Sequence, residues 1–200
     1  MDSDTTPERP RLLDRESTRP FLVVFAVAAV MWMVEIIDLL PSTSFDRWGI
    51  RPRQFEGLFG IVTAPFLHAG FGHLISNTIP FLVLGCIIAA AGVQRFVQVT
   101  VIVGVIAALG TWLIGPSGTV HIGASGIVFG YLTYLLTRGV FERKLGHIAI
   151  GLLVLFFYGG ILWGLLPRPG ISWQGHLFGA IGGVVAARVV HGQGRATNFS

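Results

Sequence analysis

Long apolar stretches separated by short polar connectors set the pattern of this 200-residue chain. Six apolar runs follow a polar and charged start, most of them near the roughly 20 residues that a helix needs to cross about 30 Å of hydrocarbon. Glycine and proline interrupt the chain between several of the runs. The pattern predicts an all-α, polytopic membrane protein, built as a six-transmembrane-helix bundle. The predicted helices cover about 21–40, 71–91, 96–114, 123–137, 148–166 and 173–190.

The segments outside these runs are polar. Residues 1–20 combine three prolines with charged residues, which predicts a disordered tail, and 191–200 form a second tail. The 42–70 loop interleaves arginines with aromatic residues, a pattern typical of a segment that lies in the membrane interface. We therefore expect one compact core over 21–190.

Composition supports a membrane protein and excludes other classes. The chain is 52% hydrophobic and only 12% charged, whereas soluble domains carry about 25% charged residues. Its net charge of +4 does not indicate a nucleic-acid partner, because basic residues gather beside membrane spans in any case. The single cysteine, Cys86, excludes an internal disulfide. The expected surroundings are the lipid bilayer of the cell membrane.

The basic residues also predict an orientation. Six spans place both termini and the even-numbered connectors on one side, and that side carries ten arginines or lysines against four on the other. Positive residues concentrate on the cytoplasmic side, so both termini are expected in the cytoplasm. The ten are Arg9, Arg11, Arg15, Arg19, Arg95, Arg138, Arg143, Lys144, Arg188 and Arg195, and the four are Arg47, Arg51, Arg53 and Arg168.

Candidate chemistry begins at Gly123-Ala124-Ser125-Gly126, which opens the fourth apolar run. Glycines allow close backbone approach, and the unpaired N–H groups of a helix N-terminus stabilise negative charge. Both features suit a serine nucleophile. With 27 glycines in the chain the tetrapeptide alone is weak evidence, and a small-residue face for helix packing is the alternative.

Two other helices bring polar groups to the same depth. Counting from the cytoplasmic ends at 1.5 Å per residue, Ser125 lies about 20 Å up its helix, His176 about 18 Å and Asn77 about 22 Å. Each would then lie several ångströms below the outer surface of a hydrocarbon core about 30 Å thick. His73 lies one turn above Asn77 and can face the same cavity. We therefore expect these side chains to converge.

Other interpretations of these residues stay open. Asn77 can join two helices, and His176 can be a packed polar residue. His68, His73, His121 and His176 can be considered as ligands of a metal-dependent protease, but no H-E-x-x-H motif is present. A transporter is a weaker alternative, because no inverted repeat is visible. His68 and His121, taken as loop residues, are expected to be structural, and Glu35 and Asp38 have no assigned role.

These residues resemble the rhomboid family of intramembrane serine proteases. The matching motifs are His73-x-x-x-Asn77, Gly123-Ala124-Ser125-Gly126, and His176 followed by Gly179 and Gly183. The resemblance implies a Ser125–His176 catalytic dyad, an oxyanion site made by Asn77, His73 and the Ser125 N–H, and transmembrane proteins as substrates. One departure is Phe59-Gly60, where many members carry Trp-Arg, which leaves the anchoring of the first outer loop open.

Further expectations follow for packing and mechanism. Gly126 and Gly130 should pack against Gly179 and Gly183, since each pair repeats at a spacing of four residues. Phe129 lies one turn below Ser125 and is expected to stack on His176 and orient it, so that no third carboxylate is needed. The reaction needs neither cofactor nor metal. The competing function is a non-catalytic rhomboid-like protein that binds membrane clients.

Overall fold

A computed structural model describes residues 15–40 and 43–196, and within them the chain is all-α. The only strand-like pairing in that part of the chain is an antiparallel bridge between Ile50 and His121. The α-helices are α1 (Arg15–Asp38), α2 (Gly60–Thr63), α3 (Phe71–Ala89), α4 (Val93–Ile114), α5 (Ser125–Glu142), α6 (Leu145–Tyr158) and α7 (Trp173–Ala196). The 3₁₀ helices are η1 (Phe45–Trp48), η2 (Phe55–Phe59), η3 (Ala64–Phe66) and η4 (Gly159–Leu165).

The six predicted helices are α1, α3, α4, α5, α6 with η4, and α7, and their ends differ by several residues from the prediction. Helix α1 begins at Arg15, so 15–20, which we assigned to the tail, are helical, with Pro20 inside the helix. Helix α7 continues past 190 to Ala196. The rest of the two predicted tails, 1–14 and 197–200, lies outside the described residues. Polar residues extend these helices beyond the apolar runs, which is why hydropathy alone misplaced their ends.

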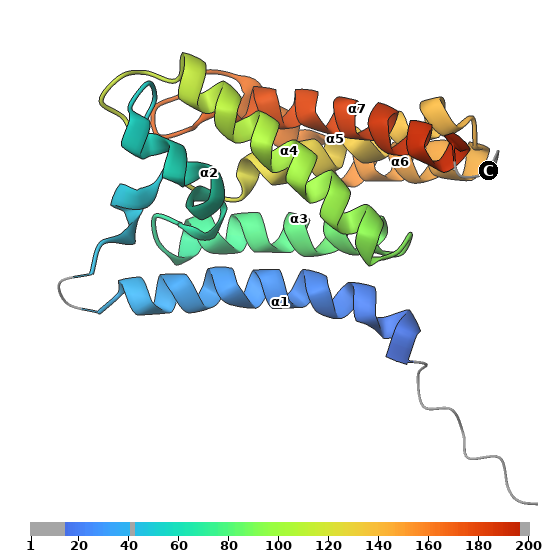
Figure 1. The fold of residues 1–200 in the computed structure, drawn as a ribbon, viewed down its shortest axis with the longest axis horizontal. Helices are drawn as coiled ribbons and strands as arrows, with labels where there is room; N and C mark the ends of the chain where they lie inside the picture. The colour runs from blue at the N-terminus through green and yellow to red at the C-terminus, as the bar shows by residue number, and fades with distance from the viewer. Residues whose placement is uncertain (1–14, 41–42, 197–200) are drawn as a thin grey trace, which may run out of the picture.

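The helices form a bundle with α5 near its centre (Figure 1). Helix α5 packs most extensively against α7, and it also contacts α3, α4 and α6. Helix α1 lies beside α3 at the edge of the bundle, and α4 crosses to pack along α7. The short helices between α1 and α3 gather at one end of the bundle. The residues that precede α3, α5 and α7 lie at that same end.

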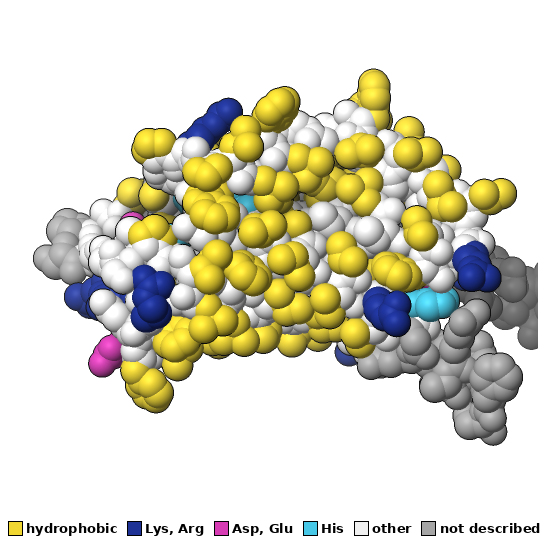
Figure 2. Space-filling model, turned by 90° about the horizontal axis from the view of Figure 1, so that it is seen from above, with side chains coloured by type: hydrophobic (Ala, Val, Ile, Leu, Met, Phe, Trp, Pro, Cys, Tyr) yellow, Lys and Arg dark blue, Asp and Glu magenta, His cyan; other side chains and the backbone are white. Residues whose placement is uncertain are grey.

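Four helical segments are long and apolar enough to cross a membrane, which indicates an integral membrane protein. They are Ser17–Asp38, Phe71–Ala89, Val93–Ile114 and Leu145–Leu165. Figure 2 shows hydrophobic side chains spread over the middle of the surface, with lysine and arginine gathered toward its ends. Helices α5 and α7 fall outside this set, because α5 carries charged residues at its end and α7 is interrupted by glycines and polar residues.

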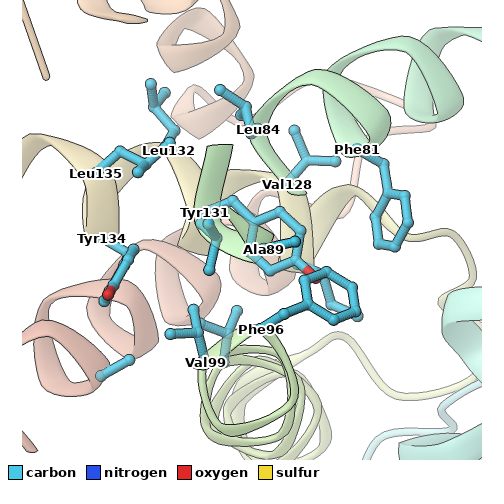
Figure 3. Close-up of a cluster of buried hydrophobic side chains, with 14 of the residues drawn as sticks. Phe81, Leu84, Ala89, Phe96, Val99, Val128, Tyr131, Leu132, Tyr134 and Leu135 are labelled. Atoms are coloured by element: carbon cyan, nitrogen blue, oxygen red, sulfur yellow. The ribbon is translucent and has the colours of Figure 1, made fainter. Parts of the chain in front are cut away.

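The main core lies where α3, α4 and α5 meet. Tyr131 is fully buried between Phe81 and Phe96, and its hydroxyl lies 2.6 Å from the Thr100 Oγ1 (Figure 3). That hydrogen bond satisfies the one polar atom of a large buried side chain, which would otherwise be costly to bury. The core therefore holds α5 firmly below the polar residues at its N-terminus.

Candidate active site

Ser125 is the first residue of α5, and the loop before it is held by close packing. The N–H of Gly123 donates to the Ala64 carbonyl over 2.8 Å. Gly123 has φ +107°, and a Cβ there would lie 2.8 Å from the imidazole of His73. Only glycine therefore fits without strain. The loop delivers Ser125 to the helix N-terminus, where its backbone N–H has no partner within the helix.

His176 of α7 meets Ser125 although 51 residues separate them. The Nε2 of His176 lies 2.8 Å from the Ser125 Oγ, and its Nδ1 lies 2.8 Å from the Gly164 carbonyl. A carbonyl only accepts, so in the neutral ring the proton is on Nδ1 and Nε2 is left to accept from the serine hydroxyl. This is the tautomer that a general base for Ser125 requires.

A ring and a backbone carbonyl hold the imidazole in place. Phe129 stacks on His176 with ring centroids 4.2 Å apart and planes inclined by 7°, the arrangement expected from the sequence. A Cβ at Gly164 would lie 2.9 Å from the Phe129 ring and 3.1 Å from the His176 Nδ1. Sequence analysis missed Gly164, because a backbone acceptor leaves no side-chain signal. The one available hint was that Gly159, Gly160 and Gly164 all fall in the last part of the predicted fifth helix.

The glycine pairs bring α5 and α7 together as predicted. A Cβ at Gly179 would overlap the Gly126 carbonyl oxygen, and one at Gly183 would overlap that of Gly130. Thr133 adds a hydrogen bond of 2.7 Å across the same seam, to a backbone carbonyl of α7. The absence of side chains at these positions sets the distance between the helices, and so the contact between Ser125 and His176.

His73 and Asn77 lie on α3, on the other side of Ser125. The Nδ2 of Asn77 donates to the His73 carbonyl over 2.9 Å, and the Nδ1 of His73 accepts from the Ala69 N–H over 3.3 Å. The neutral ring of His73 therefore carries its proton on Nε2, the atom that lies against Gly123. Both side chains line the same cavity as Ser125. Their role as oxyanion donors remains a prediction.

The cavity has a volume of about 870 Å³, and both Ser125 and His176 line it. Its walls come from the start of α3, the 116–122 loop, the loop before α7 and the Phe129 face of α5. It is therefore large enough for a peptide segment and open to water-sized molecules beside the two side chains.

Comparisons with known proteins identify the family of this chain. The Rhomboid domain family matches residues 56–193. The chain belongs to the rhomboid family. It is 49% identical to an uncharacterized protein of Mycobacterium tuberculosis over 91% of this chain and 78% of that one. It is 29% identical to Rhomboid-like protein 11 of Arabidopsis thaliana, over 78% and 63% of the two chains. It is also 29% identical to the Rhomboid protease GluP of Bacillus subtilis, over 64% and 25%.

Two further histidines lie near the active site, His121 on the cavity wall and His68 beside His73. His121 is bonded to Ser172 over 2.7 Å, and burial lowers its pKa. His68 is buried beside His73, and its burial and that neighbour lower the pKa of His68 to about 4. Among the described residues, no three His, Cys, Asp or Glu side chains are grouped as metal ligands would be.

The acids of this rhomboid lie away from His176. Glu35 is buried and accepts a hydrogen bond from the Gly70 backbone, directly before α3. Asp38 accepts from the Phe45 N–H over 2.7 Å. No aspartate or glutamate of the described chain lines the cavity. Glu35 thus ties α1 to the start of α3, and Asp38 stabilises the turn after α1, which are the roles that the sequence left unassigned.

The segment between α1 and α3, predicted as the first outer loop, is anchored by backbone packing at Gly60. A Cβ at this position would overlap the Ile50 backbone nitrogen, so the two segments touch directly. Ile50 in turn pairs with His121 in the loop that precedes Ser125. Phe59 is exposed and takes no part in this contact. Gly60 therefore connects the segment between α1 and α3, through Ile50, to the loop that precedes Ser125.

Proposed function

We propose that this rhomboid is an intramembrane serine endopeptidase that cleaves transmembrane segments near the outer face of the membrane. The observation that carries the proposal is the hydrogen bond of 2.8 Å between the Ser125 Oγ and the His176 Nε2. A pair of this kind, inside a cavity and with the base oriented by further groups, is the arrangement that activates a serine hydroxyl.

The chemistry proceeds in two halves. His176 takes the proton of Ser125 as the oxygen attacks a peptide carbonyl, and the oxyanion formed receives hydrogen bonds from the Ser125 N–H, Asn77 and His73. Protonated His176 then gives its proton to the departing amine as the C–N bond breaks, leaving an ester on Ser125. Water, deprotonated by His176, hydrolyses that ester and restores the serine.

The positive charge on His176 needs stabilisation in the absence of a carboxylate. Its Nδ1–H donates to the Gly164 carbonyl, and the face of the ring is covered by Phe129. A backbone dipole and an aromatic face both favour a cation. These contacts support a dyad in place of a triad.

All six long helices span the membrane in this proposal. Helices α5 and α7 are less apolar than the other four, but their neighbours in the bundle replace lipid around them. The ten basic residues on the side of both termini then place that side in the cytoplasm and the cavity at the outer face. Substrates are single-pass or multi-pass membrane proteins.

Labelling membranes with a fluorophosphonate probe tests the proposal. The probe should modify wild-type protein at Ser125 and should fail with Ser125→Ala and His176→Ala, which should also lose cleavage of a transmembrane substrate. Ser117→Ala is the matched control, because that serine bonds Arg53 outside the cavity and should leave labelling unchanged. A folded wild type that neither reacts nor cleaves would favour the client-binding alternative.

A further inference from the structure

The wall of the active-site cavity carries one permanent charge. Arg168 is the only Asp, Glu, Lys or Arg among the described residues that line it. Its side chain is exposed, and none of the described carboxylates forms an ion pair with it. By contrast, the outer-face Arg53 donates to the Leu113 carbonyl and the Ser117 hydroxyl, away from the cavity. Arg168 is thus the cation that an entering peptide meets.

The backbone around Arg168 is held in a tight turn. The Ile171 N–H donates to the Arg168 carbonyl over 3.2 Å, and Gly170 has φ +75°. Proline at the second position and glycine with positive φ at the third are the features of a type II turn, here Arg168-Pro169-Gly170-Ile171. Pro167 restricts the chain on the other side. The turn presents the guanidinium from a backbone with little freedom, so less entropy is lost when it binds.

We propose that Arg168 selects substrates that carry an aspartate or glutamate close to the scissile bond, an inference that rests on the proposed function. Only His73, His121 and His176 add titratable groups to the cavity wall, and no carboxylate of the described chain competes there for the cation. A concave wall that excludes part of the water strengthens attraction to an anion compared with an open surface. Guanidinium also binds carboxylate in a bidentate manner.

The experiment compares substrates that differ at one residue. The full-length protein is placed in phosphatidylcholine vesicles, whose lipid has no net charge, and the cleaved bond of a transmembrane substrate is identified by mass spectrometry. Each position flanking that bond is then changed in turn to Asp, Asn or Lys. At the responsive position, wild type should cleave the Asp substrate over the Asn substrate by about fivefold in kcat/KM, which corresponds to about 1 kcal/mol.

Variants then assign the preference to Arg168. The Asp-to-Asn ratio should fall to about one in Arg168→Gln, and Arg168→Glu should instead favour Lys. The ratio should persist in Arg168→Lys, should weaken at high ionic strength, and should be unchanged in the control Arg47→Gln, whose side chain lies over Trp48 outside the cavity. Because each ratio is internal to one variant, partial loss of folded protein does not alter it.

Two results would overturn the inference in different ways. Fluorophosphonate labelling of Ser125 together with cleavage that shows no acidic preference, or an acidic preference that survives in Arg168→Gln and Arg168→Glu, would refute the role of Arg168 alone. No labelling and no cleavage of any substrate would refute the proposed protease function as well.

Discussion

At the scale of single residues, Asn77 tests how the oxyanion is stabilised. Its amide now donates to the His73 carbonyl and lines the cavity beside Ser125. If the amide turns to the developing charge, Asn77→Ala should lower kcat by about 10²–10³, equivalent to about 3–4 kcal/mol. Steady-state cleavage by folded protein in detergent measures the change.

Thr78 provides the matched control for Asn77. It is the next residue of α3, also buried, and it accepts a hydrogen bond from Trp32 of α1. Thr78→Ala should therefore lower thermal stability and leave kcat per folded molecule nearly unchanged. An Asn77→Ala protein that behaves like Thr78→Ala would show that the amide only joins structural elements.

Phe129 tests the dyad. Removing the ring that stacks on His176 should lower kcat in Phe129→Ala and spare it in Phe129→Tyr, since the second keeps an aromatic face. Variants in which an acid of the predicted outer side is changed to its amide should retain most activity, because none of these acids lines the cavity. A folded amide variant without activity, beside an active Phe129→Ala, would establish a triad. The four amide variants are Glu35→Gln, Asp38→Asn, Asp46→Asn and Glu56→Gln.

At the scale of elements, the α5–α7 seam depends on missing side chains. Gly179→Ala would place a methyl group against the Gly126 carbonyl oxygen, closer than van der Waals contact allows, so the helices must separate. We expect a loss of about 1–3 kcal/mol in stability and a larger loss of activity, because Ser125 and His176 move apart. Gly146→Ala, where a Cβ meets nothing within 4 Å, should change neither. Thermal unfolding measures the stability and cleavage assays measure the activity of each variant. Equal behaviour of the two variants would show that close packing at Gly179 is not required.

Helix α6 buries little of its surface within the bundle. Of its side chains and glycines only Gly151 and Val154 are buried, and its main neighbour is α5. Ser76 of α3 and Ile161 of η4, just beyond α6, both line the cavity. We therefore expect substrates to enter between α3 and this segment.

A reducible crosslink between α3 and η4 tests whether substrates enter between these two segments. The two thiols are introduced as Ser76→Cys and Ile161→Cys in a Cys86→Ala background, so that no other cysteine competes. A bifunctional thiol reagent with a disulfide in its spacer should slow cleavage of a transmembrane substrate, and reductant should restore it. Each single-cysteine variant treated in the same way is the control. Unchanged rates at complete crosslinking would exclude this route of entry.

At the scale of the whole molecule, the proposed six spans predict that both termini lie in the cytoplasm. A fluorescent protein fused to the C-terminus should fold and fluoresce, whereas alkaline phosphatase at the same place should stay inactive. Phosphatase fused within the 115–122 loop should be active, because that loop lies on the cavity side. The opposite pattern would invert the topology and place the cavity at the cytoplasmic face.

Sequence alone predicted the parts of this protein that depend on local pattern. Apolar runs located six helices because burial of apolar surface is what forms them, and polar residues at equal depth predicted the meeting of Ser125 and His176. The four-residue glycine spacing predicted the close contact between α5 and α7, because a helix repeats its face about every 3.6 residues. The division of the chain into two tails and a core, with boundaries at residues 20 and 190, stays a prediction. These boundaries do not coincide with helix ends.

Only the tertiary structure decided what depends on the approach of distant backbone. The Gly164 carbonyl that orients His176, the Gly60 contact with Ile50 and the Glu35 bond to Gly70 each join residues of different helices or loops. A backbone acceptor or a missing Cβ has no side-chain chemistry to read, and helix ends depend on caps and neighbours more than on hydropathy. The position of Arg168 on the cavity wall likewise required the fold, because its sequence shows only a charged turn.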